Sequence, residues 1–253
     1  MKPLILITND DSIEAPGLHK LVELASPYGD VIAVAPRYPQ SAMSSALTMG
    51  RPLRINELDD YHGARMFTVD GTPVDCVKLA LDAIVPRRPD LLLSGINHGS
   101  NSGNAITYSG TMGAVLEGCT EGILAAGFSL CHHSIEANFD LSAPLVSELI
   151  GRLLDNGLPA HTALNVNIPP RVVPAGTRVC RAAHGHWTEE YKRYTDPSGF
   201  PFYWLTGRFV NEEPEATDTD EYWLDRGYIS VVPVTPDQTA AAALPAVARS
   251  YEL

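Results

Sequence analysis

The chain has 253 residues, of which 45% are hydrophobic, and its 30 acidic and 18 basic residues give a formal net charge of −12. This length and apolar content suit one large domain that needs no disulfide or structural metal to fold, and the acidic balance argues against nucleic-acid polymers as main partners. Four widely spaced cysteines and the lack of signal-peptide or membrane-spanning patterns indicate a reduced cytoplasmic protein that does not associate with membranes.

Short apolar runs alternate with amphipathic segments over the first two thirds of the chain. We expect strands over 3–8, 31–35, 66–69, from 91 onward, 124–130 and 163–166. Apolar residues recur every three or four positions over 18–25, 74–84, 112–123 and 141–154, which predicts helices. The alternation predicts an α/β fold, with a Rossmann-like parallel sheet between two helical layers.

From about residue 178 the alternation stops. Aromatic, extended segments over 184–187, 200–207 and 228–234, with turn signals such as 196–199, predict β-hairpins. The stretch 212–225 has seven acidic residues and no Lys or Arg, which is typical of a solvated loop or face. We therefore expect a core over 1–177 and, within the same overall domain, C-terminal hairpin arms and a helix over 178–253.

Two adjacent carboxylates, Asp10 and Asp11, directly follow the first expected strand. Ligands of open parallel sheets bind beyond the carboxyl ends of the strands. Adjacent carboxylates repel unless a positive charge lies nearby, and a hard cation such as Mg²⁺ or Mn²⁺ provides it. Capping of the next helix explains the pair equally well, so both readings stay open at this point.

A glycine-rich segment over 94–113 follows the fourth expected strand and leads into a helix. Free N–H groups at a helix N-terminus favour an anion such as phosphate, and the hydroxyls of Ser109 and Thr111 add donors. The segment has neither a dinucleotide fingerprint nor a Walker loop, and Ser109 is not in a nucleophile elbow. A capped helix after an ordinary loop is the alternative. A cation next to a phosphate site predicts metal-assisted phosphoryl transfer to water.

The chain resembles the SurE survival-protein family of metal-dependent 5′-(3′-)nucleotidases over nearly its whole length. The motifs that carry the resemblance are Ile7-Thr8-Asn9-Asp10-Asp11, Gln40-Ser41, Gly71-Thr72-Pro73-Val74-Asp75-Cys76, Ser94-Gly95-Ile96-Asn97, Tyr108-Ser109-Gly110-Thr111 and Asn165-Val166-Asn167-Ile168-Pro169. Each motif is weak alone, but the ordered set is highly specific.

The resemblance implies a site and an activity. One divalent cation, Mg²⁺ or Mn²⁺, is expected on Asp10, Asp11, Ser41 and Asn97, and phosphate is expected on Asn97, Ser109, Gly110 and Thr111. Asp10 and Asn9 are the expected catalytic residues; Asp10 orients or deprotonates the attacking water, and Asn9 contacts phosphate or metal-bound water. The implied enzyme is a 5′-nucleotidase that hydrolyses nucleoside 5′-monophosphates, and also 3′-monophosphates, and forms a homodimer or homotetramer through its C-terminal arms.

Two segments depart from the family pattern. Ser12 stands where the family usually has Gly, and 42–46 reads Ala-Met-Ser-Ser-Ala where Gly-x-Gly-His-Ser is common. Substrate preference and rate are affected more than metal binding, since all the expected ligands are present. Two alternatives remain: a nucleotide or metal sensor without turnover, and a phosphatase for polyphosphate or another small phosphate ester.

Overall fold

The computed structural model describes residues 2–132 and 137–251, and its strands form one large sheet and two small ones. The large sheet has nine strands, in the order β3-β4-β2-β1-β5-β6-β7-β13-β8. Their bounds are β1 Leu4–Thr8, β2 Asp30–Pro36, β3 Ile55–Tyr61, β4 Ala64–Val69, β5 Leu91–His98, β6 Leu124–Leu130, β7 Ala163–Ile168, β8 Thr177–Val179 and β13 Ile229–Val234. Strands β4, β2, β1, β5, β6 and β7 are parallel, whereas β3 and β13 each pair antiparallel with a neighbour.

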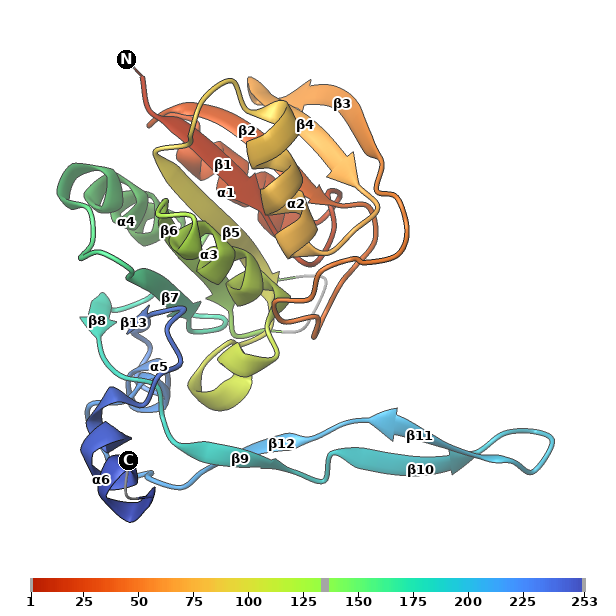
Figure 1. Cartoon of the computed structure of the whole chain (residues 1–253), viewed down its shortest axis with the longest axis vertical. Helices are drawn as coiled ribbons and strands as arrows, with labels where there is room; N and C mark the ends of the chain where they lie inside the picture. The colour runs from red at the N-terminus through yellow and green to blue at the C-terminus, as the bar shows by residue number, and fades with distance from the viewer. Residues whose placement is uncertain (1, 133–136, 252–253) are drawn as a thin grey trace.

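Helices cover both faces of this sheet (Figure 1). On one face lie α1 and α4, and on the other lie α2 and α3. The bounds are α1 Pro16–Ala25, α2 Pro73–Leu79, α3 Gly110–Thr120 and α4 Ala143–Asn156. Because β1 and β5 are buried on both sides, their sequences are almost continuously apolar. The expected three-layer α/β fold class is confirmed.

The C-terminal region adds a long arm, defined here as residues 185–211. It consists of β9 (Gly185–Thr188) paired with β12 (Arg208–Asn211), and β10 (Tyr191–Thr195) paired with β11 (Pro201–Leu205). Figure 1 shows this two-stranded arm extending far from the body of the molecule. After it come α5 (Asp220–Leu224), β13 and α6 (Leu244–Tyr251). The expected hairpins are therefore present, and β13 and β8 also complete one edge of the main sheet; the boundary at 177/178 stays a prediction.

Three local features differ from the expectations. Strand β3 was not expected, because an exposed edge strand with the sequence INELDDY lacks the apolar pattern of a buried strand. The expected helix over 74–84 is α-helical only to Leu79 and continues as a π-helix over Ala80–Ile84. The acidic stretch 212–225 is not simply a solvated face, because Asp220 within α5 is fully buried. No helix among the described residues is long and apolar enough to cross a membrane.

Candidate active site

The carboxyl ends of β1 and β5 and the N-terminus of α3 bring together the residues that the sequence singled out. Thr111 in the first turn of α3 donates its hydroxyl hydrogen to Asp10 Oδ1 at 2.6 Å. The backbone N–H of His98, at the end of β5, donates to Asp11 Oδ2 at 3.0 Å. The loop that carries Ser41 joins them, because the Gln40 N–H donates to the Asp10 carbonyl at 2.7 Å.

Asp10 is a buried carboxylate without a cationic partner. Its residue is 4% exposed, and none of the ion pairs among the described residues includes it. Burial, with a further contribution from the neighbouring Asp11 charge, raises the pKa of Asp10 to about 6. A buried charge is unfavourable unless it is paired or ligates a metal, so this position fits a bound cation.

Asp11 has a partner that sequence reasoning missed. His98 Nδ1 lies 3.2 Å from Asp11 Oδ2, the same oxygen that accepts the His98 backbone N–H. The ring also packs edge-on against Phe139. His98 directly follows Asn97, so its place at the end of an expected strand was the one signal available. These contacts fix the Asp11 carboxylate at the end of β5.

Two further expected ligands with neutral oxygens, Asn97 and Ser41, lie near the end of β5 and on the loop after β2. The Asn97 amide donates through Nδ2 to the Gly99 carbonyl at 3.0 Å, and within the described chain its Oδ1 accepts no hydrogen bond. Ser41 is exposed on its loop. Nowhere in residues 2–132 and 137–251 do three or more His, Cys, Asp or Glu side chains cluster as a metal site. Two carboxylates with an amide and a hydroxyl oxygen match a hard divalent cation such as Mg²⁺ or Mn²⁺.

The first turn of α3 lies against Asp10 and offers an anion site. Ser109 caps the helix by accepting the Met112 N–H at 3.0 Å, and the Gly110 N–H has no acceptor in the part of the chain that the structure describes. A side chain at Gly110 would place its Cβ 2.9 Å from Asp10 Cβ and Oδ2. Glycine therefore permits the close approach, while the Thr111 hydroxyl is committed to Asp10. A helix N-terminus with a free N–H favours phosphate.

Asn9 is fully buried and braces the loop that carries the carboxylates. Its Nδ2 donates to the Ser12 carbonyl at 2.8 Å, and its Oδ1 has no hydrogen-bond partner among the described residues. The expected contact between Asn9 and phosphate or metal-bound water stays a prediction.

Buried polar side chains hold the glycine-rich loop after β5 in place. Asn167 Oδ1 accepts the Asn101 N–H at 2.8 Å, and Asn165 Nδ2 donates to the Asn101 carbonyl at 2.8 Å. Asp220 Oδ2 accepts the Gly103 N–H at 2.8 Å, and its Oδ1 accepts the Ala183 N–H at 2.9 Å. Asp220 thus positions the loop, a role that its acid-rich surroundings in the sequence concealed.

The Ser41 loop is hydrogen-bonded to the segment that precedes α3 and to α2. The Ser44 N–H donates to the Tyr108 carbonyl at 3.1 Å, and the Ser44 hydroxyl donates to the Thr107 carbonyl at 2.8 Å. Further along, the Thr48 N–H donates to Asp75 Oδ1 at 3.1 Å, within the capping box of α2. Hydrogen bonds therefore hold the loop at two separate points along its length.

The departures from the family pattern fall at positions with unusual backbone angles. Ser12, Ala42 and Ser44 have φ of +99°, +62° and +50°, a region that L-residues other than glycine rarely adopt. Each stands where glycine is usual in the resembling family. Ser44 gains a side-chain hydrogen bond that glycine cannot make. The Ser12 hydroxyl makes no hydrogen bond to another described residue, so strain there is uncompensated.

Replacing Ser12 with Gly is expected to raise the free energy of unfolding by about 1 kcal/mol, because glycine adopts the positive φ without strain. Urea unfolding followed by circular dichroism measures this effect. Ser44→Gly is the matched control, and its gain should be smaller because the bond to Thr107 is lost. A destabilised Ser12→Gly protein would contradict this view of the loop.

Comparisons with known proteins decide the family. The sequence profile described as Survival protein SurE matches residues 5–189, well over half of the chain. The chain belongs to the SurE family. Two curated relatives, each called 5′-nucleotidase SurE, come from Phocaeicola vulgatus, with 45% identity over 239 residues, and Christiangramia forsetii, with 48% identity over 243 residues. Each alignment covers 94% of this chain and 93% of the relative.

A solved SurE structure has the same fold. The crystal structure of the SurE protein from Aquifex aeolicus superposes with a TM-score of 0.84 at 34% sequence identity. The match covers 98% of this chain and 100% of that one, so the arm and the C-terminal strands belong to the shared architecture.

Proposed function

We propose that this chain is a metal-dependent 5′-nucleotidase, which hydrolyses nucleoside 5′-monophosphates, and also 3′-monophosphates, to nucleoside and inorganic phosphate. The observation that carries the proposal is the buried Asp10 carboxylate, which has no cationic partner and lies against the open N-terminus of α3. The name shared by the curated relatives, 5′-nucleotidase SurE, supports the same activity.

In this proposal Asp10, Asp11, Ser41 and Asn97 hold one divalent cation, Mg²⁺ or Mn²⁺. Such a cation, when bound, lowers the pKa of a coordinated water and neutralises negative charge on a phosphoryl group. Basic side chains contribute little here, since Arg37 is the one Lys or Arg in the segments that carry these four ligands and the α3 entry.

Residues of the chain bind the phosphate and accept the proton of the attacking water. The Gly110 N–H and the Ser109 hydroxyl donate to phosphoryl oxygens at the start of α3, with the Asn97 amide beside them. Asp10 accepts the proton of the attacking water, while the Thr111 hydroxyl holds its carboxylate in one orientation. Asn9 supports this geometry by fixing the loop through the Ser12 carbonyl.

The reaction is tested by phosphate release from a panel of substrates. Nucleoside monophosphates, sugar phosphates and short polyphosphate are incubated with Mg²⁺, Mn²⁺ or EDTA. We expect metal-dependent release from the nucleoside monophosphates and no release with EDTA. Binding without turnover would instead indicate a sensor, and preferential release from polyphosphate or a sugar phosphate would indicate a different phosphatase.

We propose that the arm assembles copies of the chain into a homodimer or homotetramer. Strands β10 and β11 expose large apolar side chains to solvent, namely Tyr191, Tyr194, Phe202, Tyr203, Trp204 and Leu205. A contiguous exposed apolar surface of this kind marks a protein interface. Four cysteines, all free thiols in the structure, agree with a reducing cytoplasmic location, which is part of the proposal.

Removing residues 191–205 and joining the flanks with a short Gly-Ser turn is expected to lower the oligomeric state, because the apolar surface is lost. Light scattering coupled to size-exclusion chromatography measures the mass of both proteins. The variant Lys192→Ala, with the aromatic residues kept, serves as the control. A shortened protein of unchanged subunit number would show that assembly uses another surface.

A further inference from the structure

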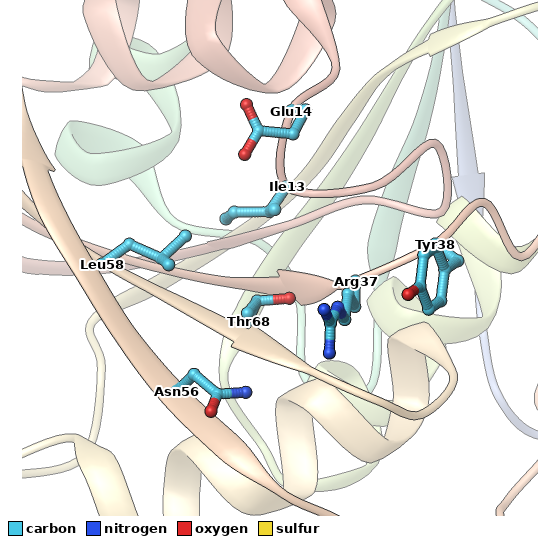
Figure 2. A pocket seen from close by; sticks show the side chains of 7 residues that line it. All are labelled: Ile13, Glu14, Arg37, Tyr38, Asn56, Leu58 and Thr68. Carbon is cyan, nitrogen blue, oxygen red and sulfur yellow. The ribbon is translucent and has the colours of Figure 1, made fainter.

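A pocket with a volume of about 380 Å³ lies on the α1 side of the sheet (Figure 2). The loops after β1 and β2 form one wall, through Glu14 and Arg37, and strands β3 and β4 form the other, through Asn56 and Thr68. Ile13 and Leu58 add apolar surface. None of these residues has a role in the metal and phosphate site.

Three polar side chains of this pocket, those of Thr68, Arg37 and Asn56, have no hydrogen-bond or ion-pair partner among the described residues. Thr68 is 6% exposed, yet among the described residues its Oγ1 has no hydrogen-bond partner. Figure 2 shows its oxygen directed toward the Arg37 side chain. Within residues 2–132 and 137–251 no carboxylate pairs with Arg37, and the Asn56 amide makes no hydrogen bond. Because a buried hydroxyl without a partner is unfavourable, the pocket favours a ligand that supplies donors and acceptors.

The pocket is joined to the candidate active site through the backbone. The Ile13 N–H donates to the Pro36 carbonyl at 2.9 Å and connects the two loops. Only two residues separate Asp11 from Glu14, and only two separate Tyr38 from Ser41. A chain advances at most about 3.5 Å per residue, so the pocket begins within about 10 Å of the proposed metal ligands. A sugar and a base attached to a phosphate at α3 extend over such a distance.

The chemistry of the pocket suits a nucleoside more than a second anion. Tyr38 is 62% exposed, and the Arg37 guanidinium lies 5.4 Å from its ring centroid. Bases stack on aromatic rings and guanidinium planes. The Asn56 side-chain amide has both a donor and an acceptor for a base edge, and the Glu14 carboxylate is an acceptor that suits ribose hydroxyls.

From these contacts we infer that the pocket of Arg37, Tyr38, Asn56 and Thr68 binds the base and ribose of the substrate. This inference rests on the proposed nucleotidase function and adds the part of the site that separates nucleoside monophosphates from other phosphate esters. Phosphate and cation stay on the α3 side, and the nucleoside extends toward β3 and β4.

The test uses the double variant Arg37→Ala/Asn56→Ala and the near-isosteric Thr68→Val, assayed as full-length proteins with metal. The substrates are AMP and glycerol 2-phosphate, which has no base. For the double variant we expect KM for AMP to rise at least 10-fold and kcat/KM for glycerol 2-phosphate to change less than 2-fold. Thr68→Val should also raise KM for AMP. Arg65→Ala is the control for loss of a positive charge, because Arg65 lies on β4 outside the pocket and pairs with Glu57.

Adenosine, which carries no phosphate, provides a second readout by calorimetric titration. We expect adenosine to bind the wild-type protein and the Arg65→Ala control at least 10-fold more tightly than the double variant. Unchanged KM for AMP and unchanged adenosine affinity in the pocket variants would overturn the inference, as would equal losses on both substrates. If the wild-type protein releases no phosphate from any nucleoside monophosphate, the proposed function itself fails, which is a different result.

Discussion

Asp10→Asn is expected to lower kcat for nucleoside monophosphates by about 10²–10⁴-fold, the usual contribution of a general base, while the protein stays folded. The neutral amide neither accepts the proton of the attacking water nor provides a charged ligand for the cation. The fold is retained because Asn is nearly isosteric and still accepts the Thr111 hydroxyl hydrogen. The substitution also removes a buried charge, so the melting temperature of the metal-free protein should not fall.

The matched control for this substitution is Asp30→Asn, which neutralises an exposed carboxylate paired with Lys2 far from the site. Its kcat should equal that of the wild type. Phosphate release under saturating metal and substrate measures the activity, and circular dichroism measures the melting temperature. If the Asp10→Asn protein kept most of the wild-type kcat, the proposed role of this carboxylate would be wrong.

Gly113→Ala is expected to lower activity by about 10²-fold without unfolding α3. A Cβ at this position would lie 2.0 Å from the Ser44 carbonyl oxygen, so the loop that carries Ser41 must move. Misplacement of a catalytic group by about 1 Å reduces rates by about this factor. The helix itself is not weakened, because Ala favours a helix over Gly by about 1 kcal/mol.

The control for this second variant is Gly118→Ala in the same helix. Its Cβ would meet the Leu92 side chain in the core, with Cδ1 at 2.9 Å, rather than the backbone of the Ser41 loop, so the site should be unaffected. Activity assays and thermal melts are compared for both proteins. Equal activity in Gly113→Ala and Gly118→Ala would show that the Ser41 loop is not required in this position.

The buried parts of the fold follow from local sequence patterns. Strand β6 begins and ends where its apolar run does, at Leu124 and Leu130, because both faces of the strand are buried. Strand β3 escaped prediction because its exposed residues carry no such pattern, and its place at the edge depends on pairing with β4. Tertiary pairing of this kind is not encoded in the strand's own residues.

In the candidate site, too, local sequence predicted some features, whereas others depend on tertiary contacts. The carboxylates after β1 and the glycine-rich loop after β5 indicated a ligand site, because ends of adjacent parallel strands meet at one edge. The His98 contact with Asp11 and the Asp220 contact with Gly103 were not predictable, since they join segments distant in the chain. The positive φ of Ser12 was not predicted either, because a serine does not by itself indicate this backbone conformation, which only the structure shows.

Titration of Mn²⁺ into the metal-free protein tests the central claim most directly, namely that Asp10 and Asp11 hold a divalent cation. Calorimetry or electron paramagnetic resonance measures the affinity and the number of ions bound. We predict one saturable site per chain, with affinity lowered at least 10-fold by Asp10→Asn or Asp11→Asn and unchanged by Asp30→Asn. Equal Mn²⁺ affinity in the wild-type protein and in both site variants would contradict the claim.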